Sequence, residues 1–128
     1  MAGPNKAEQF LHENITWKRL LSFFTQENSF LKTRLSEVVD RENDQSFIAH
    51  AEQFQNDFIL KDEYLADIGK DIRVQQENLQ KAIAGNIAPD QKICKMQEKL
   101  RNEMSYLETE FSYLKKRFNN YLLSIIEA

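Results

Sequence analysis

Apolar residues recur every three or four positions along the last third of the chain, and no Gly or Pro interrupts them. This spacing of about 3.5 residues is typical of helices that pack lengthwise against partner helices. A helix with so much apolar surface has to be covered by other parts of the chain or by a second copy. The pattern predicts one helix over about residues 89–127, and its stripe consists of Ile93, Gln97, Leu100, Met104, Leu107, Phe111, Leu114, Phe118, Tyr121 and Ile125.

Two earlier segments carry the same spacing and predict helices over about residues 6–41 and 46–84. The stripe of the first segment is Phe10, Asn14, Trp17, Leu21, Phe24, Asn28, Leu31, Leu35 and Val38. The stripe of the second is Phe47, Ala51, Phe54, Phe58, Lys61, Leu65, Ile68, Ile72, Gln75, Leu79 and Ala82. Short turns between long helices force neighbours to run antiparallel. We therefore expect an all-α fold, an elongated up-down-up bundle of three long helices with coiled-coil-like packing, forming a single domain over residues 1–128.

Residues suited to helix ends stand between the predicted helices. Asn5 is a candidate N-cap for the first helix, and Asn43, Asp44 or Ser46 for the second. Gly85 is expected to end the second helix, and Pro89 to occupy the first position of the third.

Four polar residues interrupt the apolar stripes of the first two predicted helices. Asn14 and Asn28 fall on the stripe of the first helix, where a core Asn commonly fixes helix register. A second interpretation is an internal polar pocket lined by Asn14, Asn28 and Trp17. Lys61 and Gln75 are expected at the wet margin of the second helix, and Gly69 is expected to leave that helix unbroken.

Composition narrows the classes of function. The 128 residues are 41% hydrophobic with a net charge of −3, which favours a folded domain over disorder and argues against nucleic-acid or anionic-membrane partners. The first 15 residues lack the apolar core of a signal peptide, and no segment reaches the length of a membrane span. With one cysteine, no internal disulfide can form. We expect a cytoplasmic protein.

No residue pattern of catalysis or metal binding stands out. His12 and His50 lie in different predicted helices, and neither follows a carboxylate by three residues, as the ligands of di-iron bundles do. Cys94 lies beside a stripe position and is expected to be a small buried side chain. We expect no catalytic residues, no cofactor and no metal, and hence a protein that is not an enzyme.

Four aromatic residues occupy the positions opposite the predicted core: Phe23, Phe30, Tyr106 and Tyr113. Counted from the predicted helix starts, Phe23 is level with Tyr106 and Phe30 with Tyr113, so we expect one apolar patch if the parallel first and third helices touch. Such patches commonly mark association sites, and the commonest result is a two-fold dimer. The sequence favours a non-enzymatic interaction or scaffolding protein that forms a homodimer or binds a protein partner. A small-ligand-binding or regulatory bundle with an internal polar pocket is the alternative.

Overall fold

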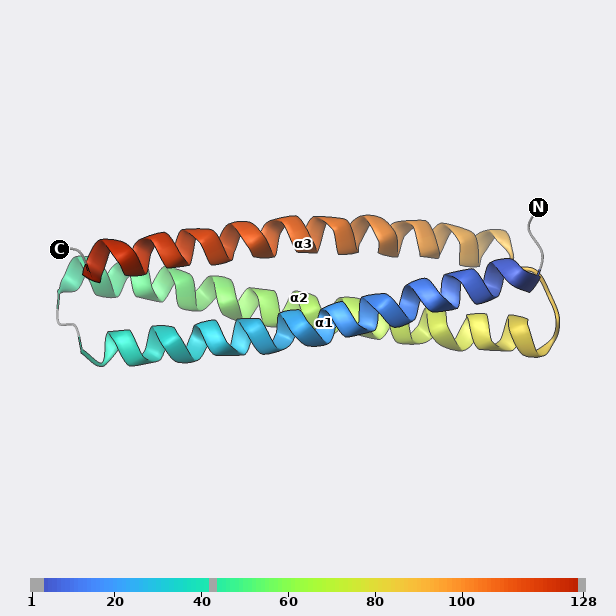
Figure 1. The fold of residues 1–128 in the computed structure, drawn as a ribbon, viewed down its shortest axis with the longest axis horizontal. Coiled ribbons are helices and arrows are strands. Elements are labelled where there is room, and N and C mark those ends of the chain that lie inside the picture. The colour runs from blue at the N-terminus through green and yellow to red at the C-terminus, as the bar shows by residue number, and fades with distance from the viewer. Residues whose placement is uncertain (1–3, 42–43, 127–128) are drawn as a thin grey trace.

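The computed structural model describes residues 4–41 and 44–126 as three long helices packed against one another along their length (Figure 1). Their bounds are Pro4–Val39 for α1, Gln45–Ala84 for α2 and Gln91–Ile126 for α3. At 1.5 Å per residue each helix is roughly 54–60 Å long. α2 runs opposite to α1 and α3 (Figure 1), which confirms the predicted all-α, up-down-up bundle.

The first two helices begin close to the predicted positions. α1 already includes Asn5, so the predicted capping role of Asn5 is wrong. Asp44 is the N-cap of α2, where its Oδ1 accepts hydrogen bonds from the backbone N–H groups of Ser46 at 2.8 Å and Phe47 at 3.2 Å. These bonds satisfy backbone donors that have no partner inside the helix. Asn43, the other candidate cap, lies outside the described residues.

Gly85 is the C-cap of α2, as predicted, and the left-handed residue that closes the helix end is Asn86. Asn86 has a left-handed φ of 53°, whereas Gly85 has a φ of −84°. The backbone N–H of Asn86 donates to the carbonyl of Ile83 at 3.1 Å, and that of Ile87 donates to Ala82 at 2.8 Å. This paired arrangement is a Schellman motif, which satisfies the last carbonyls of the helix.

The third helix begins two residues later than predicted. Pro89, predicted as its first residue, lies before it, and α3 starts at Gln91. The reason is that Asp90 provides the cap: its Oδ1 accepts a hydrogen bond from the backbone N–H of Ile93 at 2.8 Å. A carboxylate at this position also interacts favourably with the positive end of the helix dipole.

The predicted stripes form most of the core. Aromatic rings connect α3 to both other helices: Phe24 of α1 and Phe111 lie 5.2 Å apart between centroids, and Phe118 meets Phe58 of α2 edge-on at 5.2 Å. Gly69 does not interrupt α2, as predicted. The main apolar cluster comprises Trp17, Leu21, Phe24, Leu31, Leu35, Phe47, Ala51, Phe54, Phe58, Leu65, Ile68, Ile72, Leu100, Met104, Leu107, Phe111, Leu114, Phe118 and Leu122.

Ion pairs between α1 and α3 reveal the relative height of these two parallel helices. Glu13 pairs with Arg101, and Glu27 pairs with Lys115. Both pairs join residues 88 positions apart, so Phe23 is level with Phe111. The contact between the rings of Phe24 and Phe111 agrees with this height. The expected match of Phe23 with Tyr106 is therefore wrong by five residues, about 7 Å along the axis. Four of these five residues arise because α1 begins two residues earlier and α3 two residues later than predicted.

None of the helices within residues 4–41 and 44–126 is both long enough and apolar enough to cross a membrane.

Candidate functional site

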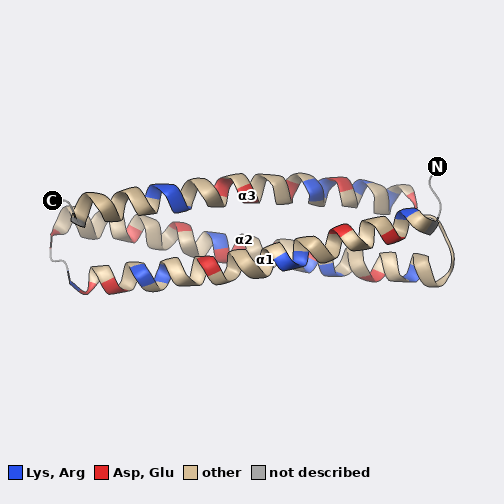
Figure 2. Cartoon of the chain, viewed as in Figure 1, with Lys and Arg blue, Asp and Glu red and all other residues tan. Residues whose placement is uncertain are grey.

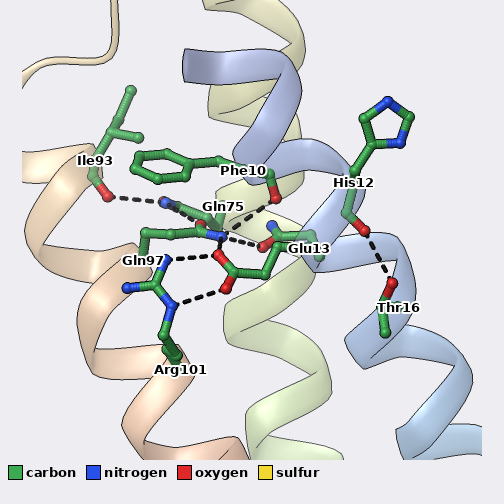
Figure 3. Close-up of polar contacts among 9 residues, drawn as sticks. Phe10, His12, Glu13, Thr16, Gln75, Ile93, Gln97 and Arg101 are labelled. Atoms are coloured by element: carbon green, nitrogen blue, oxygen red, sulfur yellow. Dashed lines mark hydrogen bonds and ion pairs between the residues drawn. The ribbon is translucent and has the colours of Figure 1, made fainter. Parts of the chain in front are cut away.

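One buried amide side chain from each helix meets in a single layer of the core (Figure 3). Asn14 comes from α1, Gln75 from α2 and Gln97 from α3, and each is at most 2% exposed. Gln75 Nε2 donates to Gln97 Oε1 at 3.0 Å, and Gln97 Nε2 donates to Asn14 Oδ1 at 3.0 Å. The prediction that Gln75 lies at the wet margin is wrong, because Gln97 at the same height gives its amide a buried partner.

A backbone carbonyl sets the direction of hydrogen bonding through this amide layer. Gln75 Nε2 also donates to the carbonyl of Ile93 at 2.9 Å, and a carbonyl can only accept. Gln97 must therefore turn its oxygen toward Gln75 and its NH₂ toward Asn14. Asn14 Oδ1 accepts in turn, and its Nδ2 is left buried without a partner among the described residues. A buried donor in this situation costs about 1–3 kcal/mol.

Glu13 and Arg101 connect the amide layer to the surface between α1 and α3 (Figure 3). The guanidinium of Arg101 donates to both carboxylate oxygens of Glu13, each at 2.7 Å. Gln97 Nε2 adds a third bond to the same carboxylate at 2.8 Å. The hydrogen bond from Arg101 is the largest cause that lowers the pKa of Glu13, outweighing the partial burial that would raise it. This two-point pair favours one alignment of the two parallel helices.

A second buried amide, Asn28, joins α1 to α2 at a different height. Its Nδ2 donates to the carbonyl of Phe58 at 2.9 Å and to Asp62 Oδ1 at 2.7 Å, and Lys32 pairs with the same carboxylate. Asn28 Oδ1 is buried and has no partner within the described ranges.

The members of the candidate polar core are not brought to one place. Asn14 and Asn28 lie 14 positions apart on α1, which is about 21 Å along the axis. Trp17 is part of the main apolar cluster and is 6% exposed. The two asparagines therefore belong to separate hydrogen-bond networks rather than to one pocket lined with Trp17.

The four aromatic residues predicted outside the core are all more than half exposed. The exposed fractions are 54% for Phe23, 64% for Phe30, 59% for Tyr106 and 61% for Tyr113. Soluble proteins tolerate single exposed apolar side chains. The members of each pair lie two helical turns apart on one side of their helix, so each helix exposes two aromatic rings on the same side.

The two aromatic pairs lie on different sides of the bundle. Tyr106 and Tyr113 line the groove between α2 and α3, together with Leu60 of α2. Phe23 and Phe30 instead flank Glu27, the residue of α1 that pairs with Lys115 of α3. The phenylalanines thus lie on the α3-facing side of α1, and the tyrosines on the α2-facing side of α3. The expected single patch is divided into two faces.

The α2/α3 groove combines aromatic side chains with charges of both signs. Tyr64 lines it and is half-buried there, and this burial raises the pKa of the phenol, with smaller contributions from Glu103 and Tyr106. Arg117 pairs with Asp57 at 3.2 Å, and its guanidinium lies over the ring of Tyr113 at 5.2 Å. Sequence reasoning missed Leu60, which is 61% exposed. Its position off the stripe of α2, beside two other apolar residues, was the available signal.

The remaining candidate chemical groups lie apart from one another. His12 and His50 are exposed on different helices, and Cys94 is half-buried near the start of α3. In the part of the chain that the structure describes, no group of three or more His, Cys, Asp or Glu side chains is placed to hold a metal ion.

Comparisons with known proteins give no functional lead: no protein-family model, curated protein or solved structure matches this chain significantly.

Proposed function

We propose that this protein is a non-enzymatic helical interaction or scaffolding protein that associates with a second copy of itself through a helix face. The observation that carries the proposal is the exposure of more than half of each of four aromatic side chains on the outer faces of α1 and α3. Large aromatic residues are enriched at the centres of protein interfaces, where charged residues are depleted. Apolar patches of this kind on a folded surface commonly mark association sites.

The composition supports the rest of the proposal. The net charge of −3 gives no electrostatic footprint for nucleic acid or for an anionic membrane surface. The single cysteine suits a reducing compartment, and we place the protein in the cytoplasm. In this proposal it needs no cofactor or metal, because its activity consists of burying its aromatic faces.

Light scattering behind a sizing column tests this proposal. Wild type is expected to run as a dimer at high concentration. We would compare it with two double variants, Phe23→Glu with Phe30→Glu and Tyr106→Glu with Tyr113→Glu. At least one should be a folded monomer, because a carboxylate placed in an apolar interface is desolvated without a partner.

A matched control places the same added charge elsewhere. Asn56→Glu with Gln80→Glu adds two carboxylates at exposed polar positions of α2 and should leave the dimer intact. A wild type that stays monomeric at every concentration would overturn self-association. Two double variants that both remain dimeric would show that neither aromatic face is the interface.

A second candidate function is a bundle that binds a small polar ligand in its interior. Its support is the pair of buried atoms, Asn14 Nδ2 and Asn28 Oδ1, that have no partner among the described residues. A ligand bound only by the folded state raises the melting temperature by mass action. A panel of metabolites, with the melting temperature as the readout, tests this second function. A rise in melting temperature that Asn14→Leu or Asn28→Leu abolishes would favour ligand binding, and an unchanged melting temperature with every metabolite would count against it.

A further inference from the structure

We propose that two rows of charged residues along the boundary between α1 and α3 fix the height of α3 and exclude positions shifted by seven residues. The apolar core leaves such a shift open, because Leu100, Leu107 and Leu114 are all buried and stand seven residues apart. A shift of seven residues, about 10.5 Å along the axis, puts one leucine in the place of the next. Among the buried residues that the structure describes on α3, only Gln97 is polar.

The loop between α2 and α3 limits how far α3 can move, but it permits one such shift. It comprises residues 85–90, between Ala84 and Gln91. Six residues span at most about 20 Å. Because neighbouring helices pack about 8–10 Å apart, a seven-residue shift needs a span of roughly 14 Å and a fourteen-residue shift one of roughly 23 Å. The loop can bridge the first distance and not the second.

Two rows of residues meet at the boundary between α1 and α3, and charges of both signs are spread along each of these helices (Figure 2). The ion pairs Glu13–Arg101 and Glu27–Lys115 join the rows at a constant separation of 88 positions. Each row continues along its helix in steps of seven residues. The row on α1 consists of Lys6, Glu13, Leu20, Glu27 and Arg34, and the row on α3 of Cys94, Arg101, Glu108, Lys115 and Leu122.

At the observed height the two rows match. Both ion pairs form, and Glu108 is level with Leu20, which packs against the main apolar cluster. Glu108 is exposed and makes no ion pair within the described residues. No residue of one described row is level with a like charge on the other. The Glu108 carboxylate therefore adds no attraction at the observed height, and its effect lies in the heights that it excludes.

A shift of α3 toward its own N-terminus replaces both attractions with repulsions. Glu108 comes level with Glu13, and Arg101 comes level with Lys6. Like charges that face each other across a contact oppose it. The two rows then contribute no attraction that would offset these repulsions.

The opposite shift has the same result. When α3 moves toward its C-terminus, Glu108 comes level with Glu27, and Lys115 comes level with Arg34. Glu108 thus meets a carboxylate of α1 at either shifted height. The charge pattern therefore distinguishes heights that the leucines do not, which specifies one arrangement against its nearest alternatives.

Removing the amide layer isolates the contribution of the charges. Replacing Asn14, Gln75 and Gln97 together with leucine leaves an apolar layer in which no hydrogen bond depends on the height of α3. The two charged rows are then the polar groups that distinguish one height from the next. This parent protein should keep α3 at the native height.

An exchange of two charges on α3 should release the shift. Arg101→Glu with Glu108→Arg keeps the net charge and turns a carboxylate toward Glu13 at the native height. With α3 shifted toward its N-terminus, the new glutamate meets Lys6 and the new arginine meets Glu13. The ratio of shifted to native molecules should rise by about a hundredfold, because two repulsions become attractions at the shifted height and one attraction becomes a repulsion at the native height.

The distance between two spin labels reports the height of α3. In a Cys94→Ala background, Thr33→Cys and Asn102→Cys place labels at exposed positions of α1 and α3. The shift toward the N-terminus of α3 moves residue 102 away from residue 33 by about 10.5 Å along the axis, a change that pulsed electron spin resonance resolves. Labelled protein is diluted into unlabelled protein, so that only distances within one chain are measured.

A second exchange drives α3 the other way. Glu108→Lys with Lys115→Glu favours the shift toward the C-terminus of α3, so a shorter distance should appear beside the native one. Lys95→Glu with Glu98→Lys exchanges charges outside the two rows and is the control expected to keep the single native distance. Circular dichroism confirms that each protein is folded. A longer distance in the first exchange or a shorter one in the second supports the proposal. Exchanged proteins that both keep the single native distance, or a parent protein that already shows two distances, would overturn it.

Discussion

Replacement of Gln97 by leucine tests whether the amide layer acts as one unit. Leucine has nearly the same size, so the core keeps its volume, but the hydrogen bonds to both neighbouring amides disappear. Gln75 keeps its bond to the carbonyl of Ile93. Asn14 is the residue left stranded, because its Oδ1 loses the donor from Gln97 while its Nδ2 is already without a partner among the described residues.

The expected cost follows from the stranded atom. A buried polar group that loses its partner costs about 1–3 kcal/mol, so Gln97→Leu should destabilise the bundle by about that amount. With a urea m-value of about 1–3 kcal/mol/M, the unfolding midpoint should fall by roughly 1 M. Circular dichroism at about 222 nm follows the loss of α-helix. It reports this midpoint directly, because nearly the whole described chain is helical.

A triple variant provides the control for this prediction. Replacing Asn14, Gln75 and Gln97 together with leucine removes every polar atom of the layer, so none is stranded, and the lost stability should return. An unchanged midpoint for the single variant would refute the view that the amides depend on one another. A triple variant less stable than the single one would refute it as well.

Three further changes test other parts of the structure. Phe111→Ala should lower the free energy of unfolding by about 3–5 kcal/mol, because the Phe111 side chain is only 3% exposed and packs against Phe24. A wild-type urea midpoint would show that Phe111 is not part of the core. Gly69→Ala should raise the melting temperature, because it reduces the freedom of the unfolded chain and stabilises the fold by about 0.5–1 kcal/mol. The new Cβ would meet Leu21 Cδ1 at an ordinary distance of 4.0 Å, and a lower melting temperature would show a closer contact. Because the pKa of Glu13 is lowered, its contribution is present above its ordinary value of 4.5 and lost as pH falls through the lowered pKa. Glu13→Gln should therefore be less stable than wild type at neutral pH, and a stability difference that does not shrink on acidification would contradict this.

The sequence was sufficient to predict most of the apolar residues that face the core. The spacing of three and four residues determines one face of each helix, and Phe58, Phe111 and Phe118 are buried where that spacing placed them. The same spacing correctly placed Phe23 and Tyr106 outside the core. These features depend on one helix at a time, which is why periodicity alone could find them.

Features that depend on how two helices meet were not predicted. The burial of Gln75 follows from the presence of Gln97 at the same height. Errors of one residue at the start of α2 and two at the start of α3 hid this kind of match. The separation of the phenylalanine and tyrosine faces depends on which neighbour each side of a helix contacts. Ion pairs such as Glu27 with Lys115 reveal that arrangement, but a single sequence does not.

Disulfide trapping is the most direct test of self-association through the aromatic faces. In a Cys94→Ala background, Thr109→Cys places a single thiol between Tyr106 and Tyr113 on α3, and Gln26→Cys places the equivalent thiol between Phe23 and Phe30 on α1. A disulfide spans Cα atoms roughly 4.4–6.8 Å apart, so a face is trapped only where it meets a second copy closely. Mild oxidation should give a covalent dimer of at least one of the two proteins on a non-reducing gel. Two proteins that both stay monomeric after oxidation would contradict self-association through these faces.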